Sequence, residues 1–155
     1  MASTELEIQY CSSGDALPTP AQFSEWANCV AELATSSEID AARSMVVRLV
    51  DREEMAELNN QWRDKDYATN VLAFPFAEPD AAAHIPLGDI VICPSVVQEE
   101  AQAQGKPLID RMAHMLIHGM LHLLAYDHQS PEEAQAMEAV EQEALARLGY
   151  AKPYE

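Results

Sequence analysis

The stretch HMLIHGMLHLLAYDH, residues 114–128, holds four of the chain's five histidines on an otherwise apolar segment. Pro107 precedes it and predicts the start of a long helix that carries the histidines. His114, His118 and His122 follow one another at intervals of four residues, so on a helix they lie along one face. Two imidazoles at this spacing can approach one ion, but positions eight apart lie about 12 Å from each other at ~1.5 Å per residue. We therefore expect a third metal ligand to come from outside this stripe.

His128 is the candidate for that third ligand. It lies six residues after His122, beyond the expected end of the helix, and a chain that turns back there can bring it beside His118 and His122. The resulting pattern H-x3-H-x5-H is the ligand spacing of metzincin zinc proteases. Gly119 stands where those proteases have the glutamate that acts as general base. The spacing thus indicates a metal, and Gly119 argues against the peptidase mechanism.

The ligand types also bear on which metal binds and what it does. Imidazole ligands favour zinc, with nickel or another transition metal as alternatives, so we expect one divalent ion per chain, with Zn2+ favoured. Three protein ligands leave a position open for water, whose pKa the ion lowers to about 7. An open position indicates catalysis. His114 is expected to lie under the site in a supporting or core position. Asp127 is expected either to hold the second ring nitrogen of a ligand or to cap the turn.

Charge limits the classes of partner. The chain has 155 residues, of which 26 are acidic and 9 are basic, giving a net charge of −17. Such a surface repels polyanions, so any nucleic-acid function needs a local basic cleft or a partner. Length and composition predict one domain over residues 1–155.

Compartment and membrane topology are indicated by other features of the chain. Three cysteines, at positions 11, 29 and 93, lack metal-ligand spacing and indicate reduced thiols in the cytoplasm. The first ten residues lack the basic start and apolar core of a signal peptide. No apolar run approaches the ~20 residues needed to cross a membrane.

Periodicity and capping signals predict the order β-α-β-α-β-β-α-α-α. Strands are expected at residues 4–10, 44–50, 70–74 and 87–93, and helices at 20–36, 52–63, 94–104, 107–124 and 131–148. This order predicts an α+β fold: a small mixed sheet of about four strands, covered by about five helices, with a zincin-like metal-binding helix.

Helix starts carry the clearest local signals. Thr19 with Gln22, and Asp51 with Glu54, have the spacing of capping boxes, and Ser130 is the expected N-cap of the last helix. The first helix is expected to bury four residues at helical spacing: Phe23, Trp26, Val30 and Leu33. In the last helix the acids are expected to face solvent, and the expected inward residues are Met137, Val140, Ala144 and Leu148.

Three blocks of the sequence resemble one known family. HGMLHLLAYDH, residues 118–128, resembles the H-G-x-L-H-L-x-G-Y-D-H signature of the YbeY endoribonucleases, the bacterial rRNA maturation factors. Residues 58–76 are similar to its L-N-x-x-[YW]-R-x-x-[DN]-x-x-T-D-V-L-S-F-P block, and residues 87–93 to its G-D-I-x-I strand. The blocks occur in the same order, and the resemblance covers nearly the whole domain.

The resemblance implies a metal-dependent hydrolase that cuts single-stranded RNA, with a role in 16S rRNA 3′-end maturation and ribosome quality control. The implied metal ligands are His118, His122 and His128, and the family's cleft arginine corresponds to Arg63. A guanidinium can bind a phosphate bidentately and stabilise charge that develops on it. The implied partners are the 16S rRNA precursor, small-subunit ribosomal proteins and an assembly GTPase.

The sequence departs from the family pattern at three positions. Asn70 replaces an aspartate, so this position carries no negative charge here, while Ala73 replaces a serine and Ala125 a glycine. The general base is not evident, and attack by water or by the RNA 2′-hydroxyl are both open. Arg63, with Lys65 and Arg111, is expected to line one basic groove for RNA.

Two other functions stay open at this point. One is a non-catalytic assembly factor of the small ribosomal subunit, in which the metal is structural. The other is a different metallohydrolase such as a peptidase, against which Gly119 argues.

Overall fold

The four expected strands form one sheet in the computed structural model, which describes residues 5–12, 14, 17–34, 44–76, 86–124, 126 and 129–152. The strands are β1 (Leu6–Cys11), β2 (Met45–Val50), β3 (Val71–Pro75) and β4 (Gly88–Ile92). Their order is β1-β2-β4-β3, in which β1, β2 and β4 are parallel and β3 is an antiparallel edge strand. The prediction of a small mixed sheet is confirmed.

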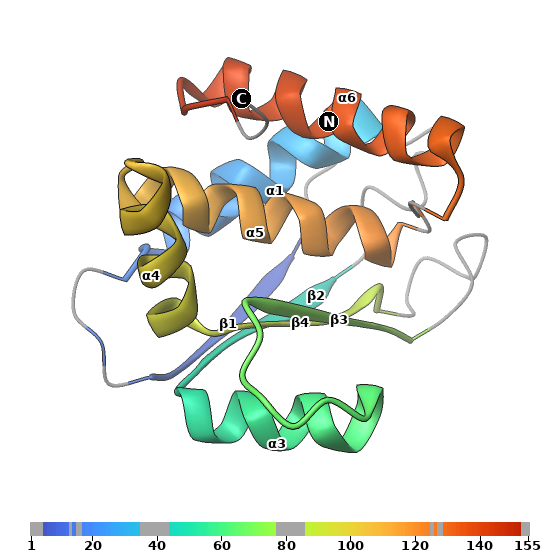
Figure 1. The fold of residues 1–155 in the computed structure, drawn as a ribbon. Coiled ribbons are helices and arrows are strands. Elements are labelled where there is room, and N and C mark those ends of the chain that lie inside the picture. Colours follow the sequence, from blue (N-terminus) through green and yellow to red (C-terminus); the bar gives the residue numbers. More distant parts are fainter. Residues whose placement is uncertain are drawn as a thin grey trace.

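Five helices cover this sheet in the described part of the chain. They are α1 (Pro20–Ala34), α3 (Arg52–Arg63), α4 (Pro94–Gln104), α5 (Leu108–Leu123) and α6 (Pro131–Leu148). In Figure 1, α3 covers one face, α1, α4 and α5 lie on the other, and α6 is the outermost helix on that side. The predicted order of elements and the α+β class are confirmed. Residue 4 of the first expected strand and residues 35–36 of the first expected helix lie outside the described residues.

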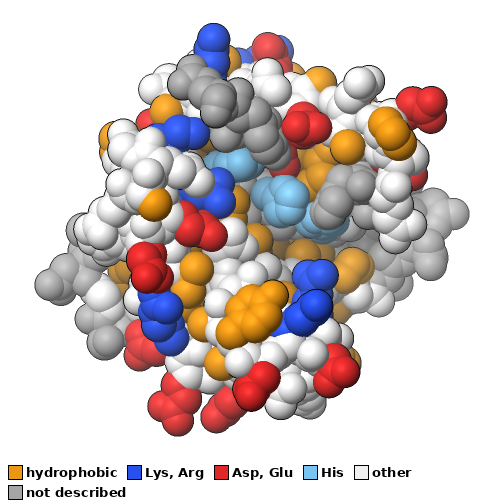
Figure 2. Space-filling view, viewed as in Figure 1, with side chains coloured by type: hydrophobic (Ala, Val, Ile, Leu, Met, Phe, Trp, Pro, Cys, Tyr) orange, Lys and Arg blue, Asp and Glu red, His pale blue; other side chains and the backbone are white. Residues whose placement is uncertain are grey.

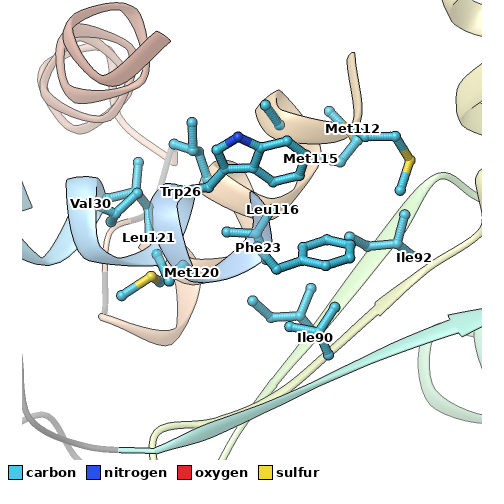
Figure 3. Close-up of a cluster of buried hydrophobic side chains, with 14 of the residues drawn as sticks. Phe23, Trp26, Val30, Ile90, Ile92, Met112, Met115, Leu116, Met120 and Leu121 are labelled. Carbon is cyan, nitrogen blue, oxygen red and sulfur yellow. The ribbon is translucent and has the colours of Figure 1, made fainter. Parts of the chain in front are cut away.

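The main core lies between the sheet and the α1–α5 layer. Phe23 and Trp26 of α1 meet edge to face, with their ring centroids 5.2 Å apart. Both rings are fully buried, and they lie among side chains of α5 and of β4 such as Ile90 (Figure 3). Rings of this size remove much apolar area from water, so they fix α1 firmly against α5. The expected burial of Phe23, Trp26 and Val30 is confirmed, while Leu33 is partly buried against the same core.

The alternation of β-strand side chains separates this core from a smaller one. Ile8, Val47 and Ile90 lie in register across β1, β2 and β4 and face the main core. The next residue on β4, Val91, faces α3 and packs with Met55 of that helix. Both faces of the sheet are therefore covered, as its parallel strands require.

Two of the three expected N-caps form. The Gln22 backbone N–H donates to Thr19 Oγ1 at 3.2 Å, and the Thr19 N–H donates to Gln22 Oε1 at 2.9 Å. At the start of α6 the Glu133 N–H donates to Ser130 Oγ at 3.1 Å. These bonds satisfy backbone donors that have no partner within the helix.

The capping box expected at Asp51 and Glu54 is wrong. Asp51 occupies the N-cap position of α3, but its side chain makes no capping hydrogen bond. Instead it accepts from Ser12 Oγ at 3.1 Å. Glu54 forms an ion pair with Arg48 of β2, 2.8 Å away. Both carboxylates have partners outside the helix, on β2 and on the loop after β1, which the spacing within the helix does not report.

No helix in the described ranges is long and apolar enough to span a membrane. All three cysteines are free. Cys11 is exposed and Cys93 is buried, and burial raises the pKa of the Cys93 thiol.

Candidate metal centre

The C-terminal half of α5 brings two imidazoles together. His118 Nε2 and His122 Nε2 lie 3.1 Å apart, and both rings are half-buried. Zinc binds histidine nitrogen at about 2.0–2.1 Å, so two nitrogens on one tetrahedral ion lie roughly 3.3 Å apart. The observed separation fits two ligands of one ion, and the expected pairing of His118 with His122 across one helical turn is present.

The other nitrogen of His118 contacts a carboxylate on α6. Glu141 Oε2 lies 2.6 Å from His118 Nδ1, and the Glu141 side chain is fully buried. Its second oxygen, Oε1, lies 3.0 Å from His114 Nε2. A carboxylate on the second nitrogen of a ligand histidine orients the ring and fixes its tautomer.

The expectation that the acids of the last helix face solvent is wrong for Glu141. This residue follows Met137 by four positions and precedes Leu145 by four, and all three are buried. Positions four apart share a face of a helix, so Glu141 lies on the inward stripe. That placement is the signal by which sequence could have found it.

His114 lies beneath the pair, as expected for a supporting residue. It is buried, and its Nδ1 lies 2.9 Å from Arg111 Nη1. Burial lowers the pKa of His114 below its ordinary value. Glu141 is the carboxylate that contacts His118. Asp127, which was expected either to hold the second ring nitrogen of a ligand or to cap the turn, lies outside the described residues.

Arg111 does not serve as a free cation for RNA, which corrects that expectation. Its side chain is only 12% exposed, and its Nη2 lies 3.0 Å from Glu100 Oε1 on α4. Asn70 donates from Nδ2 to both oxygens of Glu100, at 3.1 and 3.2 Å. The Arg111 guanidinium therefore makes its contacts inside the protein.

His114, His118 and Glu141 form a possible metal-binding cluster in the described part of the chain. Each offers one ligand atom, and these atoms lie within 4.8 Å of one another. The same atoms are also at hydrogen-bond distance, 2.6 and 3.0 Å, as in a histidine–carboxylate support. The structure thus offers a possible site for one ion around His118. His128 and Ala125 lie outside the described residues, so the expected third ligand is not tested.

Arg63 is the last residue of α3 and is exposed. Neither Arg63 nor Lys65 forms an ion pair with another described residue. In contrast, Arg48, Arg52, Arg111 and Arg147 each pair with a glutamate. No hydrogen bond or ion pair joins Arg63 to His118 or His122 among the described residues. Figure 2 shows histidines in a hollow, with Lys or Arg and hydrophobic side chains gathered below them over α3 and β3.

Three aromatic side chains, at positions 62, 67 and 76, are largely exposed. Trp62 is 62% exposed, and its ring meets Phe74 of β3 edge to face at 5.8 Å. Tyr67 and Phe76 are 58% and 57% exposed. Exposed rings next to unpaired cations are the combination with which proteins bind single-stranded nucleic acids.

Gly119 faces the sheet. A Cβ at this position would lie 2.9 Å from Ile90 Cγ2 of β4. A glutamate here would enter the packed interface between α5 and β4, so this position cannot supply a general base. The geometry therefore gives a physical reason why the metzincin glutamate is absent.

Comparison with known proteins places these features in context. The profile of the family described as "Endoribonuclease YbeY" matches residues 10–149. The chain is 50% identical over 151 residues to the Endoribonuclease YbeY of Stutzerimonas stutzeri, covering 97% of this chain and 91% of that protein. It is 48% identical over 153 residues to that of Alkalilimnicola ehrlichii, covering 97% and 90%. Its fold is similar to the solution structure of TM1509 from Thermotoga maritima, with a TM-score of 0.60, 25% identity, and coverage of 96% of this chain and 99% of that chain.

Proposed function

Because the chain belongs to the YbeY endoribonuclease family, we propose that it is a metal-dependent endoribonuclease that hydrolyses phosphodiester bonds in single-stranded RNA. Residues 1–155 act as a single hydrolase domain. The observation that carries the proposal is the pair of Nε2 atoms, on His118 and His122, that converge to 3.1 Å on one helix.

One Zn2+ per chain is held by His118, His122 and His128. The distance between the first two Nε2 atoms supports this ligand set, and so does the contact of His118 Nδ1 with Glu141, which leaves Nε2 for the ion. When bound, a divalent ion supplies Lewis acidity for phosphodiester hydrolysis. The protein's own share is to hold the two rings in one orientation before the ion arrives.

Arg63 binds the phosphate that is cleaved, and Trp62 stacks on a neighbouring base. Support for the first role comes from the exposed guanidinium, which no described acid neutralises, and from its fork of donors. Support for the second comes from the exposed indole, held edge to face by Phe74. Stacking accepts any base, so this contact gives affinity for single strands without sequence preference.

The RNA is the 16S rRNA precursor, and the reaction contributes to 3′-end maturation and ribosome quality control in the cytoplasm. The net charge of −17 disfavours binding of free RNA by most of the surface. Targeting therefore comes from protein partners, for which small-subunit ribosomal proteins and an assembly GTPase are the candidates.

The deciding experiment combines elemental analysis with a cleavage assay on the same purified sample. We expect about one zinc per chain and cleavage of a single-stranded oligonucleotide. His122→Ala and His128→Ala are expected to fold, as judged by circular dichroism, but to lose both zinc and cleavage. End-group analysis of the products distinguishes hydrolysis by water from attack by the 2′-hydroxyl, which leaves a 2′,3′-cyclic phosphate.

Two results would overturn parts of this proposal. If His122→Ala kept its zinc, the ion would lie in the cluster of His114, His118 and Glu141 instead. If the wild-type protein bound zinc, folded only with it, and cut no RNA, the metal would be structural and the protein an assembly factor.

A further inference from the structure

One continuous series of polar contacts leads from the start of β3 to the metal-facing imidazoles. It runs through six side chains: Asn70, Glu100, Arg111, His114, Glu141 and His118. The series joins the residue before β3 to α4, α5 and α6. No buried side-chain nitrogen or oxygen among the described residues lacks a hydrogen-bond partner. The directions of these contacts follow from which groups can only donate and which can only accept.

The position of each proton follows from Arg111. A guanidinium can only donate, so the Nδ1 of His114, 2.9 Å from Arg111 Nη1, accepts. Because Nδ1 accepts, the ring proton of His114 lies on Nε2 and is donated to Glu141 Oε1. As a carboxylate, Glu141 accepts at both oxygens, and His118 then donates to it from Nδ1, 2.6 Å away. The lone pair of His118 then lies on Nε2, the atom that faces His122.

We propose that Glu141 is a positioning residue that holds His118 as its Nδ1–H tautomer, with the direction of the hydrogen bonds set by Arg111 through His114. The inference rests on the proposed function in one respect: the nitrogen that faces His122, Nε2 of His118, is the proposed zinc ligand. Which imidazole nitrogen carries the proton is generally set by the partner of the other nitrogen. Here that partner is fully buried and accepts from two rings at once.

The wild-type protein itself provides the first test. In metal-free protein labelled with ¹⁵N-histidine, long-range ¹H–¹⁵N correlation spectra at neutral pH report the tautomer of each ring. We expect Nδ1–H for His118 and Nε2–H for His114. A His118 ring with its proton on Nε2 would overturn the proposal, without any variant or activity measurement.

Glu141→Gln makes a sharper prediction because an amide has one acceptor and one donor. Arg111 keeps His114 in its Nε2–H form, so the amide oxygen accepts from His114 and the amide N–H₂ faces His118. His118 must then accept at Nδ1 and carry its proton on Nε2, the metal-facing atom. We expect this variant to show the opposite tautomer at His118 and an unchanged tautomer at His114.

Zinc affinity gives an independent readout, measured by competition with a chromophoric chelator. Loss of such a supporting partner weakens metal binding by about 10- to 100-fold. We expect that loss in Glu141→Gln. The matched control Glu138→Gln, one turn earlier on α6, should stay within about twofold of wild type. Equal affinity in Glu141→Gln and wild type, with His118 still Nδ1–H, would overturn the inference.

The two proposals fail in different ways. If zinc bound equally to wild type and His122→Ala, the proposed metal centre would be wrong, but the tautomers of the metal-free protein would still decide the role of Glu141. If His118 and His114 showed the reversed tautomers while His122→Ala lost zinc, the proposed metal centre would be supported and the positioning role of Glu141 would be wrong.

Discussion

Arg63 ends α3 with its charge uncompensated by any described acid, which suits it to an anionic substrate. We expect Arg63→Ala to lower the cleavage rate by about 10²-fold or more, the cost of removing one donor to developing charge. Arg63→Lys should recover part of this rate, because an ammonium keeps the charge but not the fork of donors. Steady-state cleavage of a single-stranded oligonucleotide measures both.

Arg52→Ala is the matched control for Arg63, because Arg52 begins the same helix and pairs with Glu99. Its cleavage rate should equal that of wild type. Wild-type rates in Arg63→Ala would remove this residue from the proposed site.

Trp62 exposes an indole beside Arg63. A stacked base contributes about 1–3 kcal/mol, so Trp62→Ala should weaken RNA binding by roughly 5- to 150-fold. Fluorescence anisotropy with a labelled oligonucleotide measures this loss. Tyr10→Ala serves as control, because Tyr10 is an exposed aromatic on β1, the opposite edge of the sheet from β3. Equal losses in both variants would contradict a stacking site at Trp62.

Asp89 on β4 gives a pH-dependent prediction. Burial raises the pKa of Asp89 above its ordinary value of 3.8, and Glu7 adds to the effect. A raised pKa in the folded state means that the charged carboxylate lowers stability above that pKa, and that this penalty disappears as pH falls. Asp89→Asn should therefore raise the free energy of unfolding at pH 7, and the gain should vanish at acid pH.

Urea unfolding of Asp89→Asn at the two pH values tests this sign. Glu57→Gln, an exposed neutralisation on α3, controls for net charge. A gain for Asp89→Asn that grew as the pH fell would show that the carboxylate is stabilised by folding.

At the scale of elements, the contact between α5 and β4 depends on Gly119. Alanine favours a helix by about 1 kcal/mol over glycine, but over-packing a core costs ~1–3 kcal/mol. Because the new Cβ would lie 2.9 Å from Ile90 Cγ2, we expect Gly119→Ala to lower the free energy of unfolding by up to about 2 kcal/mol. Denaturant titration measures the change.

A double-mutant cycle identifies the cause of that loss. In an Ile90→Ala background the clash is absent, so Gly119→Ala should become neutral or stabilising. A stabilising effect in the wild-type background would mean that α5 and β4 pack less closely than the structure has them.

The elements themselves were predictable from sequence, because their signals are local. Ser130 before α6 and Thr19 with Gln22 at α1 act within one turn, and both caps form. The capping bond expected at Asp51 and the solvent exposure expected for Glu141 are wrong, because the partners of both residues lie elsewhere in the fold. Periodicity predicts which face of a helix is inward. It does not predict that the buried carboxylate of Glu141 contacts two imidazoles of the neighbouring helix.

At the scale of the molecule, 26 acidic residues outnumber 9 basic residues. If Arg63 and Lys65 each contact one phosphate, the logarithm of the binding constant should fall with the logarithm of salt with a slope of about −1.4 for single strands. Arg63→Ala should bring that slope to about −0.7, whereas Arg52→Ala should leave it unchanged. Anisotropy titrations over a salt series measure it. Tight binding with no salt dependence would place the RNA elsewhere.

The part of the site that could be predicted from sequence is the part formed by the histidines spaced four residues apart. His118 and His122 were found because a helix turn brings them together, and His114 because it shares their face. Arg111 was expected to meet RNA, since nothing local to α5 reveals that Glu100 of α4 lies against it. Long-range ion pairs of this kind are set by how helices pack, which one-dimensional spacing does not encode.

The bond between Asn70 and Glu100 links two positions that lie 30 residues apart in the sequence. The amide donates to both oxygens of the carboxylate, at 3.1 and 3.2 Å. An aspartate at position 70, the residue of the family pattern, would set two carboxylates face to face beside Arg111, which disfavours the charged form of one of them. We therefore predict that position 100 or its surroundings changes together with position 70 across the family.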